Sequence, residues 1–165
     1  VYDNGGIYLD TDVELLKKPD FLLENQCYIG IQQPESLCNT GLGFGAQKSS
    51  PVVQKMMECY DSISFTDQKK STFACPWLND KVIRSFGKVS NEDITYLKEV
   101  TVYPPRFFDP LSTGNTKNLL CDETVSIHHY AATWAGNKQR WKRKLIRFFG
   151  EDRYFKLKKL FRRVQ

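Results

Sequence analysis

Long apolar runs are absent from this chain of 165 residues: no stretch reaches the roughly eighteen residues that a membrane-spanning helix needs. No secretory leader is visible, and no internal repeat or low-complexity linker divides the sequence. Apolar residues make up 41% of the chain and charged residues 26%, which is typical of a soluble globular protein. We therefore expect one ordinary domain in the cytoplasm.

Cysteine pairs of the C-x-x-C type, which are typical of zinc and redox sites, are also absent. The five cysteines are odd in number and scattered along the chain: Cys27, Cys38, Cys59, Cys75 and Cys121. We expect buried free thiols rather than disulfides, in keeping with a cytoplasmic protein.

Histidine is scarce, since His128 and His129 are the only two, and they follow a strand-like apolar run. Side chains alternate along a strand, so at most one of these rings is expected to face a given site. A neutral imidazole can bind Mn²⁺ and a protonated one can donate to phosphate, so both roles stay open. The plain alternative is that both rings pack at the end of a strand.

The most informative feature that is present is a pair of carboxylates, Asp10 and Asp12, after an apolar run that begins at Gly5-Gly6. If residues 7–13 form one strand, the two carboxylates leave the same edge of a sheet, because residues two apart share a face. Carboxylates are ligands that Mg²⁺ and Mn²⁺ prefer, with phosphate oxygens and water completing the shell. We therefore expect a Mn²⁺ or Mg²⁺ site suited to a diphosphate.

Two alternatives compete for these acids. A calcium loop would begin with Asp10, Asp12 and Glu14, but its sixth position is Leu15 instead of glycine and its twelfth is Phe21 instead of glutamate. The other alternative is a solvated strand end, because a D-x-D tripeptide recurs freely in proteins.

Periodicity indicates alternating strands and helices along the rest of the chain. Strands are expected at residues 27–31, 42–46, 100–103 and 124–128. Helices are expected to begin at Pro51 and Pro76, the first with a core stripe of Val52, Val53, Met56, Met57 and Tyr60. This order indicates an α/β protein with a mixed sheet flanked by helices.

Residues 2–17, which contain the two carboxylates, resemble the D-x-D segment of glycosyltransferase family 32. This family contains capsular-polysaccharide and mannosyl or galactosyl transferases that use nucleotide sugars. Four more segments resemble the family's blocks in the family's order: NTGLGFGA at 39–46, TFACPWL at 72–78, VYPPRFFDP at 102–110 and HHYAATW at 128–134. In the second of these, Ala74-Cys75 departs from the usual small residue and glycine.

The resemblance implies a partial GT-A-like nucleotide-diphospho-sugar transferase fold. Residues 1–136 would be the C-terminal portion of the catalytic domain, because a nucleotide-binding βα segment precedes this point in the family. The implied activity is metal-dependent transfer of a sugar, with retention, from a nucleoside-diphosphate sugar to a glycan or lipid-linked acceptor. Synthesis of capsular or other surface polysaccharide is the implied setting.

Roles for single residues follow from the same comparison and from their chemistry. Asp10 and Asp12 would act through the metal, with His128 as the first candidate for a further ligand and His129 as the second. Candidate substrate-binding residues are Gly5, Gly6, Tyr8, Asn39, Asp80 and Trp134, and Asp109 is a further candidate for contacting sugar hydroxyls or the acceptor. For Asn39, Asp80 and Asp109 the ordinary alternative is a turn residue or a helix-surface acid.

Positive charge is concentrated near the end of the chain. Residues 138–163 carry twelve Lys or Arg against two acids, a balance of +10 within an overall +5, so the remainder is near −5. Apolar and aromatic residues recur there at helical spacing, which predicts a basic amphipathic helical tail over residues 137–165.

The tail leaves two interpretations open. A basic amphipathic helix can lie on an anionic membrane surface, which would place the protein at the inner face of the cell membrane. Its apolar stripe can equally pack on the domain or on a second protomer. Nucleic acid is not expected, because no recognised module accompanies the charge. The alternative function is therefore a non-catalytic module that binds a membrane surface or a partner through this tail.

Overall fold

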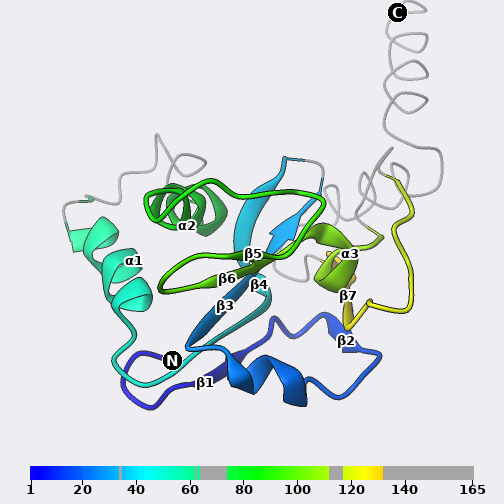
Figure 1. Ribbon diagram of the computed structural model, residues 1–165, viewed down its shortest axis with the longest axis horizontal. Helices are drawn as coiled ribbons and strands as arrows, with labels where there is room; N and C mark the ends of the chain where they lie inside the picture. Colours follow the sequence, from blue (N-terminus) through cyan, green and yellow to red (C-terminus); the bar gives the residue numbers. More distant parts are fainter. Residues whose placement is uncertain (34, 62, 64–73, 112–116, 132–165) are drawn as a thin grey trace, which may run out of the picture.

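The structure is a computed structural model that describes residues 1–33, 35–61, 63, 74–111 and 117–131 (Figure 1). Trp134, the tail at 137–165 and the first two residues of the 72–78 block lie outside the described residues. Our expectations for them stay predictions.

A mixed sheet of five strands forms the centre of the described protein, in the order β1-β4-β3-β6-β5. Only β3 and β6 run parallel; the other neighbours are antiparallel. A second, two-stranded sheet joins β2 to β7 in antiparallel register. The strands are β1 (Gly6–Tyr8), β2 (Val13–Leu15), β3 (Cys27–Gln32), β4 (Leu37–Ala46), β5 (Thr95–Tyr96), β6 (Thr101–Tyr103) and β7 (Ser126–His128).

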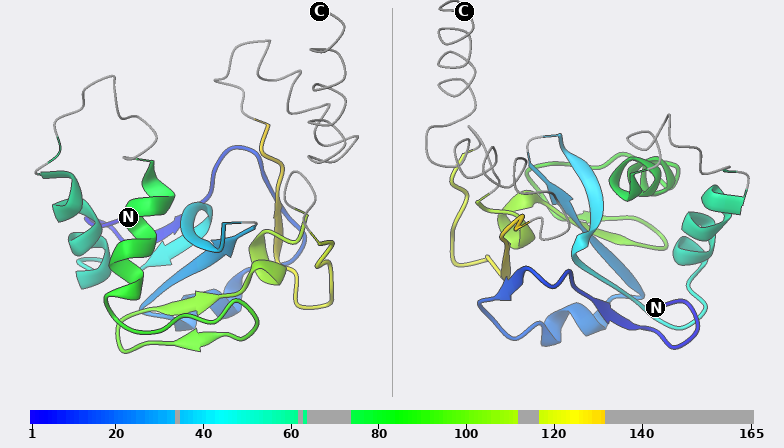
Figure 2. Two further views of the ribbon diagram at one scale, coloured as in Figure 1. Left: turned by 90° about the horizontal axis from the view of Figure 1, so that it is seen from above. Right: turned by 180° about the vertical axis from the view of Figure 1, so that it is seen from behind.

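Helices cover both faces of the five-stranded sheet. On one face, α1 (Pro51–Asp61) and α2 (Cys75–Arg84) lie side by side (Figure 2). The other face carries the short helices η1 (Asp20–Glu24) and α3 (Pro105–Phe108). Within the described ranges, no helix has the length and apolarity needed to cross a bilayer.

Alternation along β3 separates two cores. Cys27, Ile29 and Ile31 face α1 and α2, whereas Tyr28 faces the opposite way. The first core continues with Cys38, Phe44, Ala46, Val52, Val53, Met56, Val82, Ile83, Val100 and Val102. The second contains Leu22, Leu42, Tyr103, Phe107, Phe108 and Val125 around Tyr28.

The pairing of β3 with β4 contains one large irregularity. Ile29 pairs with Phe44, but the next residue, Gly30, pairs with Asn39, so residues 40–43 bulge out of the ladder. Bulges redirect a strand and commonly occur at sheet rims beside functional sites. Here the bulge brings Gly41 against the segment that follows β1.

Most of the expected elements are present, with differing lengths. The strands expected at 27–31 and 100–103 correspond to β3 and β6, and those at 42–46 and 124–128 overlap β4 and β7. Helices begin at Pro51 and Cys75. The mixed α/β architecture with flanking helices is confirmed.

The expectation of a single strand over residues 7–13 was wrong. Strand β1 ends at Tyr8 and β2 begins at Val13. Between them the backbone N–H of Asp10 donates to the carbonyl of Gly41, and the N–H of Val13 donates back to the carbonyl of Asp10. This turn moves the chain from the five-stranded sheet to the two-stranded one.

Two expectations about burial were only partly right. Met57 was placed in the core stripe of α1, but its side chain is 51% exposed. All five cysteines are free thiols; Cys27 and Cys38 are buried as expected, whereas Cys75 and Cys121 are exposed.

Candidate metal centre

Asp10, Asp12 and His128 converge at the junction of the two sheets. Each side chain offers one ligand atom, and these atoms lie within 4.8 Å of one another. Nε2 of His128 is 3.4 Å from Oδ2 of Asp10 and 3.3 Å from Oδ1 of Asp12. The two acids come from the β1–β2 connection and the histidine from the end of β7, so the cluster joins the first and the last parts of the described chain.

Pairing of β2 with β7 brings His128 to the acids. Val13 pairs with His128, which places Asp12 beside the residues that follow β7. The N–H of His129 donates to the carbonyl of Asp12 at 2.9 Å, and the N–H of Ala131 donates to its Oδ2 at 2.7 Å. One carboxylate oxygen of Asp12 is thereby fixed, and the other faces His128.

The bulge of β4 sets the position of Asp10. Gly41 lies so close that a Cβ atom at this residue would collide with Oδ2 of Asp10. Glycine is therefore the residue that leaves room for this carboxylate beside the sheet. On the other side, the hydroxyl of Tyr8 donates to Oδ1 of Asp10 at 2.8 Å. This hydrogen bond, followed by partial burial, raises the pKa of Tyr8.

Asn39 supports the bulge from within. Its Oδ1 accepts the N–H of Gly41 at 2.9 Å, and its Nδ2 donates to Oε1 of Gln32 at 2.7 Å. The side chain is buried, so its amide is used inside the protein. Asn39 therefore acts on Asp10 through the backbone of Gly41.

His128 has the environment of a ligand. Its ring is buried, and neither ring nitrogen has a hydrogen-bond partner in the described part of the chain. Burying a polar group without a partner is costly, so such groups usually signal an ion, a water or a functional role. A divalent cation held by Nε2 and the two carboxylates would give Nε2 a partner and offset the negative charge of the two acids. Two oxygens and one imidazole nitrogen suit Mn²⁺ better than Mg²⁺, which prefers oxygen ligands throughout.

His129 points away from the cluster, as alternation predicts for one of the two histidines. Its Nε2 lies 2.8 Å from Oε2 of Glu14, and both side chains are about half exposed. The structure therefore brings His128, not His129, to the carboxylates. Glu14 is also absent from the cluster, which disagrees with a calcium loop.

Asp80 lies in α2 and makes structural contacts. Its Oδ1 accepts the N–H of Cys38 at 3.1 Å, and its Oδ2 pairs with Nε of Arg84 at 2.8 Å. The carboxylate is buried between α2 and β4, where it ties the helix to the strand. Asp80 is therefore a helix acid with structural contacts, but it is buried and does not lie on the helix surface as the ordinary alternative had it.

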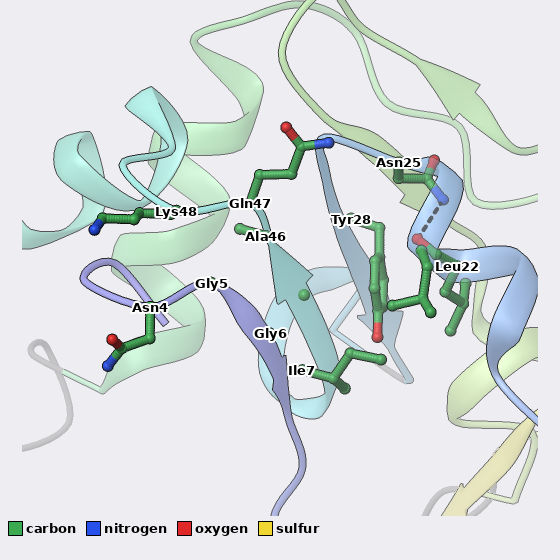
Figure 3. A pocket seen from close by; sticks show the side chains of 12 residues that line it. Asn4, Gly5, Gly6, Ile7, Leu22, Asn25, Tyr28, Ala46, Gln47 and Lys48 are labelled. Carbon is green, nitrogen blue, oxygen red and sulfur yellow. Dashed lines mark hydrogen bonds between the residues drawn. The ribbon is translucent and has the colours of Figure 1, made fainter.

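Gly5 and Gly6 lie at the start of β1, whereas Asp10 follows its end. Gly5 has a φ of 70°, and a side chain there would meet the backbone of Lys48, so this glycine serves the turn before the strand. Both glycines line a cavity of about 260 Å³ between this turn and η1, with Tyr28 in its wall (Figure 3).

A second cavity, of about 280 Å³, is lined in part by Tyr8, whose hydroxyl donates to Asp10. Thr40 and Asn79 give it polar groups, and Nδ2 of Asn79 donates to Oγ1 of Thr40 at 3.2 Å. Residues of α1 form its apolar wall, among them Val53, Met56 and Met57.

Sequence reasoning missed several contributors to the centre. Gly41 is one of three closely spaced glycines, at 41, 43 and 45, and the sequence does not show which of them has a steric role. Ala131 contributes through its backbone N–H, which every residue except proline has. Tyr130, which lies against His128, stood in the 128–134 block but was assigned no role.

Comparison with family models, with curated proteins and with solved structures found no match to this chain. The geometry of the centre therefore carries the functional inference.

Proposed function

We propose that this protein is a glycosyltransferase that uses a nucleoside-diphosphate sugar and a divalent cation held by Asp10, Asp12 and His128. The observation that carries the proposal is the meeting of the D-x-D acids with His128. These residues belong to the first and the last of the sequence segments that resemble glycosyltransferase family 32. The fold supports it too, because a mixed sheet flanked by helices is compatible with part of a GT-A-like domain.

The chain's own residues suit this reaction in two ways. Two carboxylates and one imidazole supply the ligands, and the backbone N–H of Ala131 with the hydroxyl of Tyr8 orients the carboxylates. When bound, a cation of this kind acts as a Lewis acid that offsets negative charge on a departing diphosphate.

The cavity beside Tyr8 is the proposed place for the transferred sugar or the acceptor. Its lining combines the hydroxyl of Thr40 and the amide of Asn79 with apolar residues of α1. Sugars combine hydroxyl edges with apolar faces, so a cavity of mixed lining fits them. We propose transfer with retention to a glycan or lipid-linked acceptor in the synthesis of surface polysaccharide.

Calorimetry with Mn²⁺ and a nucleoside diphosphate tests this proposal. UDP or GDP should release binding heat with the wild-type chain only when Mn²⁺ is present. Asp12→Asn should abolish that heat, whereas the exposed Asp122→Asn should retain it, because Asp122 lies outside the cluster. Equal heat with and without Mn²⁺, no binding of Mn²⁺ itself, or an unaffected Asp12→Asn variant would contradict the proposal.

A panel of nucleotide sugars then identifies the donor. Slow hydrolysis of one donor in the presence of Mn²⁺ is expected, with loss in Asp12→Asn. Hydrolysis of no donor by a chain that binds Mn²⁺ and nucleoside diphosphate would count against a transferase.

A further inference from the structure

Tyr130 connects the candidate metal ligand His128 to a buried acid. Its ring contacts the imidazole of His128 edge-on, with centroids 4.1 Å apart and an interplanar angle of 78°. Its hydroxyl donates to Oδ2 of Asp109 at 2.8 Å. The tyrosine therefore spans from the ring of His128 to the carboxyl group of Asp109.

Asp109 is a fixed anchor for this hydroxyl. It follows α3, is fully buried, and its Oδ2 also accepts the N–H of Gln33 at 2.6 Å. The side-chain amide of Gln33 donates in turn to the carbonyl of Asp109 at 2.8 Å. These hydrogen bonds join the end of α3 to the end of β3. The carboxyl group that accepts from the Tyr130 hydroxyl is therefore fixed to a strand of the central sheet.

The backbone of Tyr130 affects a second ligand. Its φ of 50° lies in the left-handed region, which is uncommon for a residue with a side chain. The turn made there directs the N–H of Ala131 to Oδ2 of Asp12. A strained backbone conformation of this kind persists only where surrounding contacts stabilise it. The hydrogen bond from the Tyr130 hydroxyl to Asp109 is such a contact.

The chemistry of Asp109 argues against simple core packing. A buried carboxyl group is costly, and an apolar side chain of similar size usually packs at least as well. Oδ1 of Asp109 has no hydrogen-bond partner in the described ranges, so burial is incompletely compensated. Desolvation accordingly raises its pKa to about 7. The hydrogen bond that Asp109 accepts from Tyr130 explains why a carboxyl group is found at this buried position.

We propose that Asp109 and Tyr130 form a positioning pair that orients the imidazole of His128 and, through Ala131, the carboxylate of Asp12 for a divalent cation. The pair acts on the ligands and touches neither cation nor substrate. This inference rests on the metal site of the proposed function. Residues that orient metal ligands commonly change metal affinity by about tenfold or more when they are replaced.

Mn²⁺ binding without nucleotide, followed by electron paramagnetic resonance, tests the pair. Tyr130→Phe keeps the ring against His128 but removes the hydroxyl, so Mn²⁺ should bind about tenfold more weakly. Tyr130→Leu removes the ring as well and should bind more weakly still. Tyr96→Phe, at a tyrosine that is 75% exposed, is the matched control and should bind as the wild type does.

Variants of Asp109 separate positioning from general stability. In Asp109→Asn the amide oxygen can still accept from Tyr130 and Gln33, so Mn²⁺ affinity should stay within about twofold of wild type. Asp109→Leu removes the acceptor and should match Tyr130→Phe. Combining Asp109→Leu with Tyr130→Phe should weaken binding little further, because both changes break one connection. The NMR chemical shifts of the His128 ring protons, measured without metal, should differ from those of the wild type in Tyr130→Phe. In Asp109→Asn they should be unchanged.

The outcomes separate this inference from the proposed function. If Asp12→Asn abolishes Mn²⁺ binding but Tyr130→Phe binds like wild type, the positioning pair is refuted and the metal site stands. If thermal stability falls in Tyr130→Phe while affinity and the His128 shifts stay unchanged, the pair is structural only and the inference is wrong. If the wild type binds no Mn²⁺, both the inference and the proposed function fail.

Discussion

Nε2 of His128 lies 3.3 Å from Oδ1 of Asp12, although the two residues come from opposite ends of the described chain. Their approach follows from the pairing of β2 with β7, in which Val13 is opposite His128. Because the register of this small sheet sets the distance, changes to either residue test the centre directly.

The two adjacent histidines make a matched pair for the first prediction. His128→Ala removes a ligand and should weaken Mn²⁺ binding by at least about tenfold, because the loss of a residue that only supports a ligand already costs about that much. His129→Ala should retain wild-type affinity, because its ring lies on the other side and contacts Glu14. Equilibrium dialysis measures both. Equal losses in the two variants would show that the assignment of faces is wrong.

Gly41 gives a steric prediction. Gly41→Ala places a methyl group that collides with Oδ2 of Asp10, so the carboxylate must leave its present position beside His128. Mn²⁺ affinity should fall by about the same factor as in other variants that displace ligands. Far-ultraviolet circular dichroism should show an intact fold. A Gly41→Ala protein with unchanged Mn²⁺ affinity would show that Asp10 is not held as described.

Asp109 predicts a pH dependence of stability. Its folded pKa of about 7 lies above the usual value of 3.8, because burial disfavours the charged form. Between these values the folded protein keeps a proton that the unfolded chain has released. The contribution of the protonated Asp109 carboxyl group to the free energy of unfolding is therefore fully present below about pH 4. It is lost as the pH rises through 7, at up to about 1.4 kcal/mol per pH unit.

Urea unfolding at pH 5 and pH 8 measures this effect. Asp109→Asn cannot ionise, so the free energy of unfolding of this variant should fall less between the two pH values than that of the wild type. Other groups titrate in both proteins, and comparing the two isolates Asp109. The same fall in both proteins would argue against the raised pKa.

Asp80 distinguishes a structural acid from a substrate contact. Asp80→Ala leaves the buried N–H of Cys38 without its acceptor, which should cost about 1–3 kcal/mol of folding free energy. Mn²⁺ affinity should stay unchanged, because Asp80 is not part of the cluster. Denaturant unfolding and a Mn²⁺ titration check the two halves. Intact stability with lost sugar-nucleotide binding would support the substrate role instead.

Local patterns in the sequence were sufficient for the elements but not for their junctions. Pro51 and the apolar spacing after it predicted α1, and β3 followed from its apolar run. Alternation also predicted that at most one of the two histidines would face the acids, and His128 does. The break between Tyr8 and Val13 could not be predicted, because it depends on hydrogen bonds to Gly41, which belongs to another strand.

The supporting residues of the centre were beyond sequence reasoning for the same reason. The bulge at residues 40–43 exists only in the register of β4 against β3. The link from Asp109 to Tyr130 needs α3 and the end of β7 to pack together, and neither residue carries a local signal of the other. Both are long-range relationships that composition and periodicity do not encode.

Anomalous diffraction from crystals grown with Mn²⁺ and a nucleoside diphosphate tests the central claim most directly. We predict an anomalous peak in contact with Asp10, Asp12 and His128, with the diphosphate completing the shell. The result that would contradict the account is a nucleotide bound without a peak at these residues, or a peak at another site while the three side chains keep their present contacts.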